Sequence, residues 1–157
     1  MASLTLPNLT LQSSHQKTWS IPADFLGKWT LLYFYPKDDT PGCTIQACTY
    51  RDHKQDWEKS GLNVLGVSLD DLTSHDAFSR KFELNFPLLA DTEKKLATAL
   101  KVYGEQEWQG KTYMGLSRDS FLINPKGEIT KEWRKVDPKT TVAETLKEAL
   151  LQLKAHS

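Results

Sequence analysis

The 157-residue chain is long enough for one domain with an apolar core that needs no disulfide or metal to support it. Its 20 basic and 20 acidic residues balance, which argues against nucleic acid or an anionic membrane as its partner. No apolar run approaches the ~20 residues of a membrane span, and the segment Met1 to Leu11 lacks the basic and apolar blocks of a secretory signal.

The first part of the chain predicts a small edge hairpin, a strand buried on both faces and a long helix. In chain order, the expected segments are Leu4 to Leu6, Leu9 to Leu11 and Thr18 to Ile21 for the hairpin, Thr30 to Tyr35 for the strand, and Thr44 to Lys59 for the helix. Gly61 is expected to end this helix. Its buried face is expected to carry Ile45, Cys48 or Thr49, His53 and Trp57.

The middle of the chain continues the alternation of strands and helices. Leu62 to Leu69 predicts a second buried strand, and Pro87 to Ala90 predicts a short third one. Thr73 or Ser74 is expected to cap the helix between them. Asp91 is expected to cap another helix that reaches about Val102, before a loop or irregular strand from residue 104 to residue 117.

The C-terminal part predicts an antiparallel hairpin and a last helix. Asn124, Pro125 and Gly127 suit a type I turn between the strands Ser120 to Ile123 and Glu128 to Trp133. Thr141 with Glu144 is expected to form a capping box for the last helix. The fold class is therefore α/β, a thioredoxin-like fold with an N-terminal β extension and a mixed central sheet flanked by helices. Residues 1–157 are expected to form a single domain.

Cys43 is placed for nucleophilic chemistry, because it follows Thr40-Pro41-Gly42 at the start of a predicted helix. Unpaired N–H groups and the positive end of a helix dipole favour the thiolate there. Gly42 lets a small ligand approach the backbone, and Pro36 stiffens the preceding loop. The Thr40 hydroxyl can accept from a substrate or donate to the sulfur, besides capping the helix. On position alone, a buried unreactive thiol is an equally good interpretation.

Cys48 lies five residues after Cys43. In one helix this spacing separates the side chains by ~140° and the Cα atoms by ~8–9 Å. A disulfide requires Cα atoms within about 7 Å, so the first turn would have to unwind before the two cysteines could pair. Two cysteines and no secretory signal fit a reducing compartment, where such a disulfide is transient and catalytic.

The sequence predicts no metal site. Cys43, Cys48 and His53 are evenly spaced, but successive rotations of ~140° scatter them around a helix. The absence of a C-x-x-C pair argues against a general dithiol oxidoreductase. The polar residues expected to be solvated or to cap helices are His15, His75, His156, Asp38-Asp39 and Asp70-Asp71.

The pattern Pro36-x-x-x-Thr40-x-x-Cys43 resembles the active-site signature of peroxiredoxins. The longer string from Tyr35 to Asp52 is similar to the bacterioferritin comigratory protein/peroxiredoxin Q branch of that family. The resemblance spans nearly the whole chain, with further matching segments at Gly66 to Ser68, Asn85 to Asp91, Gly110 to Gly115 and Arg118 to Ile123.

The resemblance implies a thiol peroxidase that acts on hydroperoxides without haem, metal or flavin. It assigns Cys43 as the peroxidatic cysteine and Cys48 as the resolving cysteine, with Thr40, Pro36 and Arg118 as active-site partners. It also implies an intramolecular Cys43–Cys48 disulfide that thioredoxin or a similar dithiol reduces. Physical chemistry agrees on the arginine, because a thiolate needs a nearby cation and a guanidinium keeps its charge.

Two other functions would use the same residues. A thioredoxin-fold redox relay would pass its disulfide to a partner without sustained peroxide turnover, and a purely structural domain would bury both thiols. For the peroxidase we expect a monomer that contacts neither nucleic acid nor membrane. Its expected location is the cytoplasm, or an organellar stroma after removal of a transit peptide.

Overall fold

The computed structural model describes residues 4–155, in which strands and helices alternate along most of the chain. The strands are β1 (Leu9–Ser13), β2 (Lys17–Ile21), β3 (Trp29–Phe34), β4 (Leu62–Ser68), β5 (Leu88–Ala90), β6 (Tyr103–Trp108), β7 (Lys111–Leu116), β8 (Ser120–Ile123) and β9 (Ile129–Trp133). The helices are α1 (Pro41–Asp52), α2 (Lys54–Lys59), α3 (Leu72–Lys81), α4 (Lys95–Ala99), α5 (Thr141–Ala155) and the 3-10 helix η1 (Ala23–Phe25).

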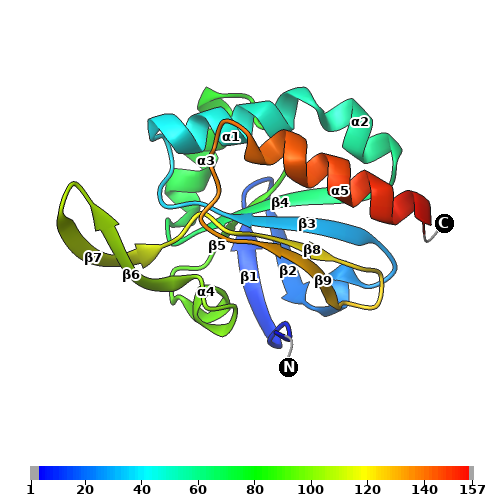
Figure 1. The fold of residues 1–157 in the computed structure, drawn as a ribbon, viewed down its shortest axis with the longest axis horizontal. Coiled ribbons are helices and arrows are strands. Elements are labelled where there is room, and N and C mark those ends of the chain that lie inside the picture. Colours follow the sequence, from blue (N-terminus) through cyan, green and yellow to red (C-terminus); the bar gives the residue numbers. More distant parts are fainter. Residues whose placement is uncertain (1–3, 156–157) are drawn as a thin grey trace.

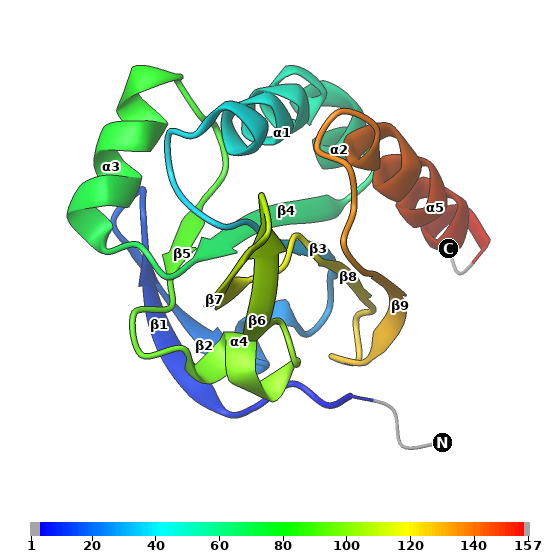
Figure 2. The same ribbon diagram turned by 60° about the vertical axis from the view of Figure 1, so that its left-hand side comes forward.

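Seven strands form one mixed sheet in the order β2-β1-β5-β4-β3-β8-β9. The central strands β3, β4 and β5 are parallel, whereas β8 and β9 close one side with antiparallel pairing. Helices α1, α2 and α5 lie along one face of the sheet and α4 lies on the other (Figures 1 and 2). The predicted α/β, thioredoxin-like fold with its N-terminal β extension is confirmed. No helix within residues 4–155 is long and apolar enough to cross a membrane.

β3 contributes to two apolar cores, one on each face of the sheet. Leu31 and Tyr33 pack with residues of α1, α2 and α5, whereas Leu32 and Phe34 pack with residues of α4. This alternation is the two-residue period of a strand, and it makes the run from Thr30 to Tyr35 almost wholly apolar. Burial on both faces fixes the end of β3, from which the chain enters the loop before α1.

The predicted helix from Thr44 to Lys59 is two helices, because the backbone at His53 leaves the helical region between α1 and α2. Its predicted buried face is wrong for α1. Ile45 is 40% exposed, and the buried residues of α1 are Cys43, Gln46, Ala47 and Tyr50. Apolar periodicity pointed to the wrong face because a polar and two small side chains occupy the inward positions.

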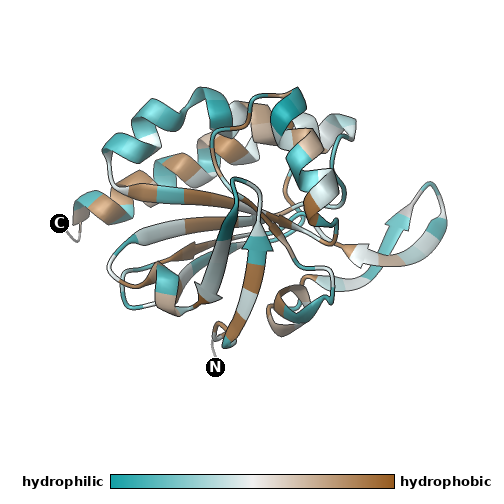
Figure 3. Cartoon of the chain, turned by 180° about the vertical axis from the view of Figure 1, so that it is seen from behind, coloured by the Kyte–Doolittle hydropathy of each residue, from teal (hydrophilic) through white to brown (hydrophobic). Residues whose placement is uncertain are grey.

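The segment that we predicted as a loop or irregular strand is an antiparallel hairpin. β6 pairs with β7 in a regular register from Tyr103 opposite Leu116 to Trp108 opposite Lys111. The hairpin projects from the body of the molecule, and its outer part is mainly hydrophilic to neutral (Figures 1 and 3). Because β7 buries only its last residue, its sequence carries no strong apolar period.

Helix starts differ from the predicted caps. Asp71, rather than Thr73 or Ser74, caps α3, and its carboxylate accepts a hydrogen bond of 2.9 Å from the Ser74 N–H. α4 is shorter than predicted, although the Asp91 carboxylate accepts hydrogen bonds from two N–H groups at its start. Thr141 lies inside α5, and its buried hydroxyl has no partner among the described residues, so the predicted capping box does not form.

The two predicted hairpins are present, with one difference. β1 and β2 pair as expected, but the stretch from Leu4 to Leu6 is not a strand. The β8–β9 turn is closed by a hydrogen bond of 2.9 Å from the Gly127 N–H to the Asn124 carbonyl. This is the pairing expected of the predicted type I turn.

Two predictions of solvent exposure are wrong. His75 is fully buried and Asp38 is 7% exposed. Each side chain offsets the free-energy cost of removing the other from water, because the His75 Nδ1 lies 2.7 Å from a carboxylate oxygen of Asp38. His15 and Asp39 are exposed as expected, and His156 lies outside the described residues.

Candidate active site

Cys43 lies in the first turn of α1, close to the end of β3. The chain leaves β3 after Phe34, crosses a short loop and enters α1 at Pro41, with Thr40 in the extended N-cap conformation. The first helical hydrogen bond runs from the Thr44 N–H to the Thr40 carbonyl over 2.8 Å. Pro41 loses nothing in this position because it has no N–H, and the N–H groups that follow have no partner inside the helix. These groups surround the sulfur with partial positive charge.

Arg118 reaches the same sulfur from the segment that leads into β8. The antiparallel register of β3 and β8 places Tyr33 opposite Ser120, so Arg118 lies beside the end of β3. Its carbonyl accepts a hydrogen bond of 2.9 Å from the Val136 N–H, which holds its backbone. Its Nη1 lies 3.5 Å from the Cys43 Sγ, although 75 positions separate the two residues in sequence. The structure therefore brings a fixed cation to the thiol at the helix start.

Gln46 belongs to the same group, and the sequence analysis missed it. Its Oε1 accepts a hydrogen bond of 2.9 Å from Nη1 of Arg118, the same nitrogen that approaches Cys43. Gln46 is fully buried and stands one turn after Cys43, on the same face of α1. It orients the guanidinium towards the sulfur. A polar residue three positions after the cysteine was the available signal.

The Thr40 hydroxyl precedes Cys43 in the chain, and its proton is already engaged in a hydrogen bond. Its Oγ1 donates a hydrogen bond of 2.8 Å to the Lys37 carbonyl. The same oxygen is therefore free to accept a hydrogen bond in the active site, but not to donate one to the sulfur. The predicted capping role is wrong for the side chain, because Thr40 occupies the N-cap position without a side-chain capping hydrogen bond. Pro36 is exposed at the other end of this loop, directly after β3.

Cys43 is buried, with only 1% of its surface exposed. Its neighbours Thr40, Gly42 and Arg118 are partly exposed. A molecule that reaches the sulfur in this conformation therefore passes these residues and has to be small at its reacting end.

Comparisons with known proteins agree with this geometry. A model of the AhpC/TSA family matches residues 3–132. The chain is 45% identical to peroxiredoxin Bcp of Bacillus subtilis over 140 residues, which cover 89% of this chain and 88% of that protein. The chain belongs to the AhpC/TSA family of peroxiredoxins. It is also 38% identical to peroxiredoxin Bcp of Xanthomonas campestris over 156 residues, with 99% and 92% of the two chains covered.

Solved structures place this peroxiredoxin in the peroxiredoxin Q branch. Peroxiredoxin Q of Xanthomonas campestris superposes with a TM-score of 0.84 at 38% identity, covering 99% of this chain and 98% of that one. A cysteine-to-serine mutant of peroxiredoxin Q from Xylella fastidiosa gives a TM-score of 0.83 at 31% identity and covers 99% of both chains. The predicted branch and the predicted enzyme class, a thiol-dependent peroxidase, are confirmed.

Both cysteines of this peroxiredoxin are free thiols within the continuous helix α1. Their spacing in a helix, ~8–9 Å between Cα atoms, is too long for a disulfide. Partial burial raises the pKa of the Cys48 thiol, an effect that nearby Arg51 opposes and Asp52 reinforces.

Gly42→Ala in this peroxiredoxin is expected to slow oxidation of Cys43 by hydrogen peroxide. A Cβ at position 42 would lie 3.1 Å from Nη2 of Arg118 and 3.3 Å from Cγ of Pro138, so the guanidinium has to move by a fraction of an ångström. A displacement of ~1 Å in a catalytic group costs about 100-fold, and we therefore expect a three- to tenfold loss for this smaller shift. Stopped-flow kinetics with increasing peroxide gives the second-order rate constant.

Gly104→Ala is the matched control, because no atom lies within 4 Å of a Cβ at that position. Alanine is the better helix former, so Gly42→Ala should not lower the midpoint of thermal unfolding. An unchanged oxidation rate in Gly42→Ala would show that the reaction does not depend on this position of the guanidinium.

Proposed function

We propose that Cys43 is the peroxidatic cysteine and Cys48 the resolving cysteine of a two-cysteine reaction within one chain. Thr40, Pro36 and Arg118 are its active-site partners. The observation that carries this proposal is the 3.5 Å contact between Nη1 of Arg118 and the Cys43 Sγ at the start of α1. A structural domain has no need of a cation against a thiol at this position.

In the first step, the Cys43 thiolate attacks the terminal oxygen of a hydroperoxide. An S–O bond forms and the O–O bond breaks, so the sulfur loses two electrons and becomes a sulfenic acid. The leaving oxygen takes a proton and departs as an alcohol or as water. Arg118 stabilises the negative charge that grows on this oxygen, and the Thr40 oxygen accepts the hydrogen bond of the peroxide O–H.

In the second step, the start of α1 unwinds and Cys48 attacks the sulfenic sulfur. An S–S bond forms, the S–O bond breaks and water leaves. The far end of α1 is held, because the Tyr50 hydroxyl lies 2.6 Å from that of Thr145 and Arg51 Nη1 donates a bond of 2.6 Å to the Phe82 carbonyl. The motion is therefore confined to the turns that carry the two cysteines.

In the third step, thioredoxin or a similar dithiol exchanges with the Cys43–Cys48 disulfide and returns both thiols. The bacterioferritin comigratory protein of Xanthomonas campestris, whose structure gives a TM-score of 0.84 at 38% identity, has an alkyl peroxide reduction activity. On this basis we propose organic hydroperoxides as substrates alongside hydrogen peroxide. We further propose that residues 1–157 act as one monomeric domain in the cytoplasm, without a nucleic-acid partner.

Cys48→Ser is expected to keep one rapid peroxide reduction and to lose recycling through the internal disulfide. The measurement is peroxide consumption in a thioredoxin-coupled assay, with a burst equal to one peroxide per chain followed by a slow steady state. Thr49→Ser is a matched control, because it changes the next residue of α1 without removing a thiol. Sustained turnover at the wild-type rate in Cys48→Ser would remove Cys48 from the reaction, and absence of the burst would leave only a redox relay.

A further inference from the structure

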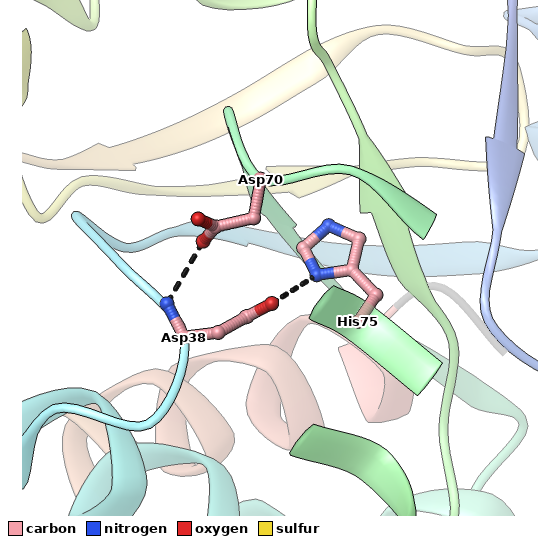
Figure 4. A group of neighbouring side chains, drawn as sticks. All are labelled: Asp38, Asp70 and His75. Carbon is pink, nitrogen blue, oxygen red and sulfur yellow. Dashed lines mark hydrogen bonds and ion pairs between the residues drawn. The ribbon is translucent and has the colours of Figure 1, made fainter. Parts of the chain in front are cut away.

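A cluster of two buried polar side chains and one half-buried one holds the loop that precedes Cys43, and none of them takes part in the reaction above. Asp38 lies in that loop, Asp70 follows β4, and His75 lies on α3 (Figure 4). The Asp38 N–H donates a hydrogen bond of 2.8 Å to Oδ2 of Asp70. The Asp38 carboxylate lies 2.7 Å from Nδ1 of His75. The loop is thus fastened to two other elements through one residue.

The hydrogen bonds of His75 identify its protonation. Nδ1 faces the Asp38 carboxylate, and Nε2 lies 2.9 Å from the Leu89 carbonyl oxygen. A carbonyl oxygen cannot donate, and both carboxylate oxygens of Asp38 already accept hydrogen bonds from hydroxyl groups. Both ring nitrogens of His75 therefore face acceptors, which is the arrangement of a protonated ring paired with a carboxylate.

Asp38 completes a buried ion pair. One carboxylate oxygen accepts a hydrogen bond of 2.5 Å from the Tyr35 hydroxyl, and the other accepts one of 2.8 Å from the Ser74 hydroxyl. Together with Nδ1 of His75, these groups surround the Asp38 carboxyl group in the arrangement of a carboxylate acceptor. Its charge is balanced by His75, which is fully buried.

The same contacts argue against a metal in this cluster. Asp38, Asp70 and His75 have ligand atoms within 4.8 Å of one another. However, both ring nitrogens of His75 already face oxygen partners, and the Asp38 N–H already occupies an oxygen of Asp70. The hydrogen bonds within the cluster satisfy the ring without an ion.

We propose that His75 is a positioning residue for peroxide reduction. Through Asp38 it holds the loop, and with it Thr40 and the first turn of α1, in the conformation in which Cys43 reacts. It does not touch the substrate. This inference rests on the proposed role of Cys43, since it concerns the rate at which that sulfur is oxidised.

The location of the ion pair leads to a kinetic distinction between two steps. Asp38 precedes Cys43, whereas the turns that unwind for disulfide formation follow the loop. A loosened loop should therefore slow oxidation of Cys43 but leave attack by Cys48 no slower. A purely structural role for His75 would lower both rates together, in proportion to the folded fraction.

Two substitutions separate the two contacts of His75. In His75→Asn, the amide nitrogen takes the place of Nδ1 and still donates to Asp38. In His75→Gln, the amide nitrogen takes the place of Nε2 and donates to Leu89 instead, leaving Asp38 without this partner. We expect about a 10- to 100-fold slower oxidation of Cys43 in His75→Gln, on the scale of a displaced catalytic group. His75→Asn should restore most of this loss.

The test is stopped-flow kinetics of both variants and the wild type, with oxidation and disulfide formation followed as separate phases. Equal oxidation rates in the two variants, or parallel losses in both phases, would overturn the proposal. Side-chain 15N NMR of His75 in the wild type provides a second measurement that needs no variant. We expect the imidazolium pattern, and a neutral tautomer would remove the ion pair on which the proposal rests.

A negative result for His75 can be distinguished from a negative result for Cys43 as the peroxidatic cysteine. Mass spectrometry after a pulse of peroxide identifies the oxidised residue in each variant. Oxidation of Cys43 at unchanged rates in both variants would contradict the role of His75 alone. Oxidation at a residue other than Cys43 in the wild type would contradict the proposed function itself.

Discussion

Cys43→Ser is expected to reduce peroxide turnover to the uncatalysed background, a loss of about 10⁴-fold or more, as when the nucleophile of a covalent catalyst is removed. A serine hydroxyl is a far weaker nucleophile at neutral pH and forms no sulfenic acid. The measurement is peroxide consumption with saturating thioredoxin and its reductase. Substitution should leave the fold intact, because serine has nearly the same size as cysteine.

The matched control for this result is the Cys48→Ser variant, which also exchanges one thiol of α1 for a hydroxyl. It should retain the single-turnover burst that Cys43→Ser loses. Residual steady turnover in Cys43→Ser would mean that Cys48 reacts with peroxide directly, and would reverse the proposed roles of the two cysteines.

Arg118→Gln is expected to lower the rate constant of Cys43 oxidation by about 10²- to 10³-fold, the usual cost of removing one electrostatic stabiliser of a transition state. The 3.5 Å contact with the sulfur is lost, and so is the cation towards which the leaving oxygen develops charge. Arg118→Lys should recover part of the rate, because it keeps a charge but not the planar fork that also bonds Gln46. Competition for hydrogen peroxide with a reference peroxidase provides the measurement.

Reduction of the oxidised enzyme separates the role of Arg118 from a general loss of structure. The rate at which thioredoxin reduces the Cys43–Cys48 disulfide should change little in Arg118→Gln, since no peroxide is involved in that step. Arg80→Gln, on the exposed side of α3, removes the same charge far from the reaction and is the control. Equal rates of Cys43 oxidation in Arg118→Gln and the wild type would exclude the guanidinium from the transition state.

Elements that bury apolar side chains could be predicted from sequence. β3 and β4 are continuous apolar runs, and the β8–β9 turn carries Asn124, Pro125 and Gly127 in the required positions. The β6–β7 hairpin could not be found in this way, because β7 is exposed along most of its length. Its regular register comes from backbone hydrogen bonds, which leave little trace in side-chain pattern.

The candidate site was predictable where one short segment contains the relevant residues. Thr40, Cys43 and Cys48 lie in a single motif, and resemblance to a family added Arg118. The role of Gln46 was not predicted, because a polar side chain on the buried face of α1 contradicts the apolar period of a helix. His75 escaped for a different reason. Its partner Asp38 lies 37 positions away, and only the fold shows that the two side chains contact each other in the interior.

Because Cys43 is only 1% exposed, the size of a reagent decides whether it can react with the sulfur. The terminal oxygen of a hydroperoxide is small enough to reach a sulfur that lies beneath Thr40, Gly42 and Arg118. Glutathione, bulky alkylating agents and thioredoxin are too large to approach it in this conformation. Chemical modification of Cys43 should therefore follow the frequency with which α1 opens, while peroxide reacts with the closed form. In the proposed mechanism the enzyme therefore reacts with its oxidant and with its electron donor in two different conformations, and the opening of a single helix separates the two reactions in time.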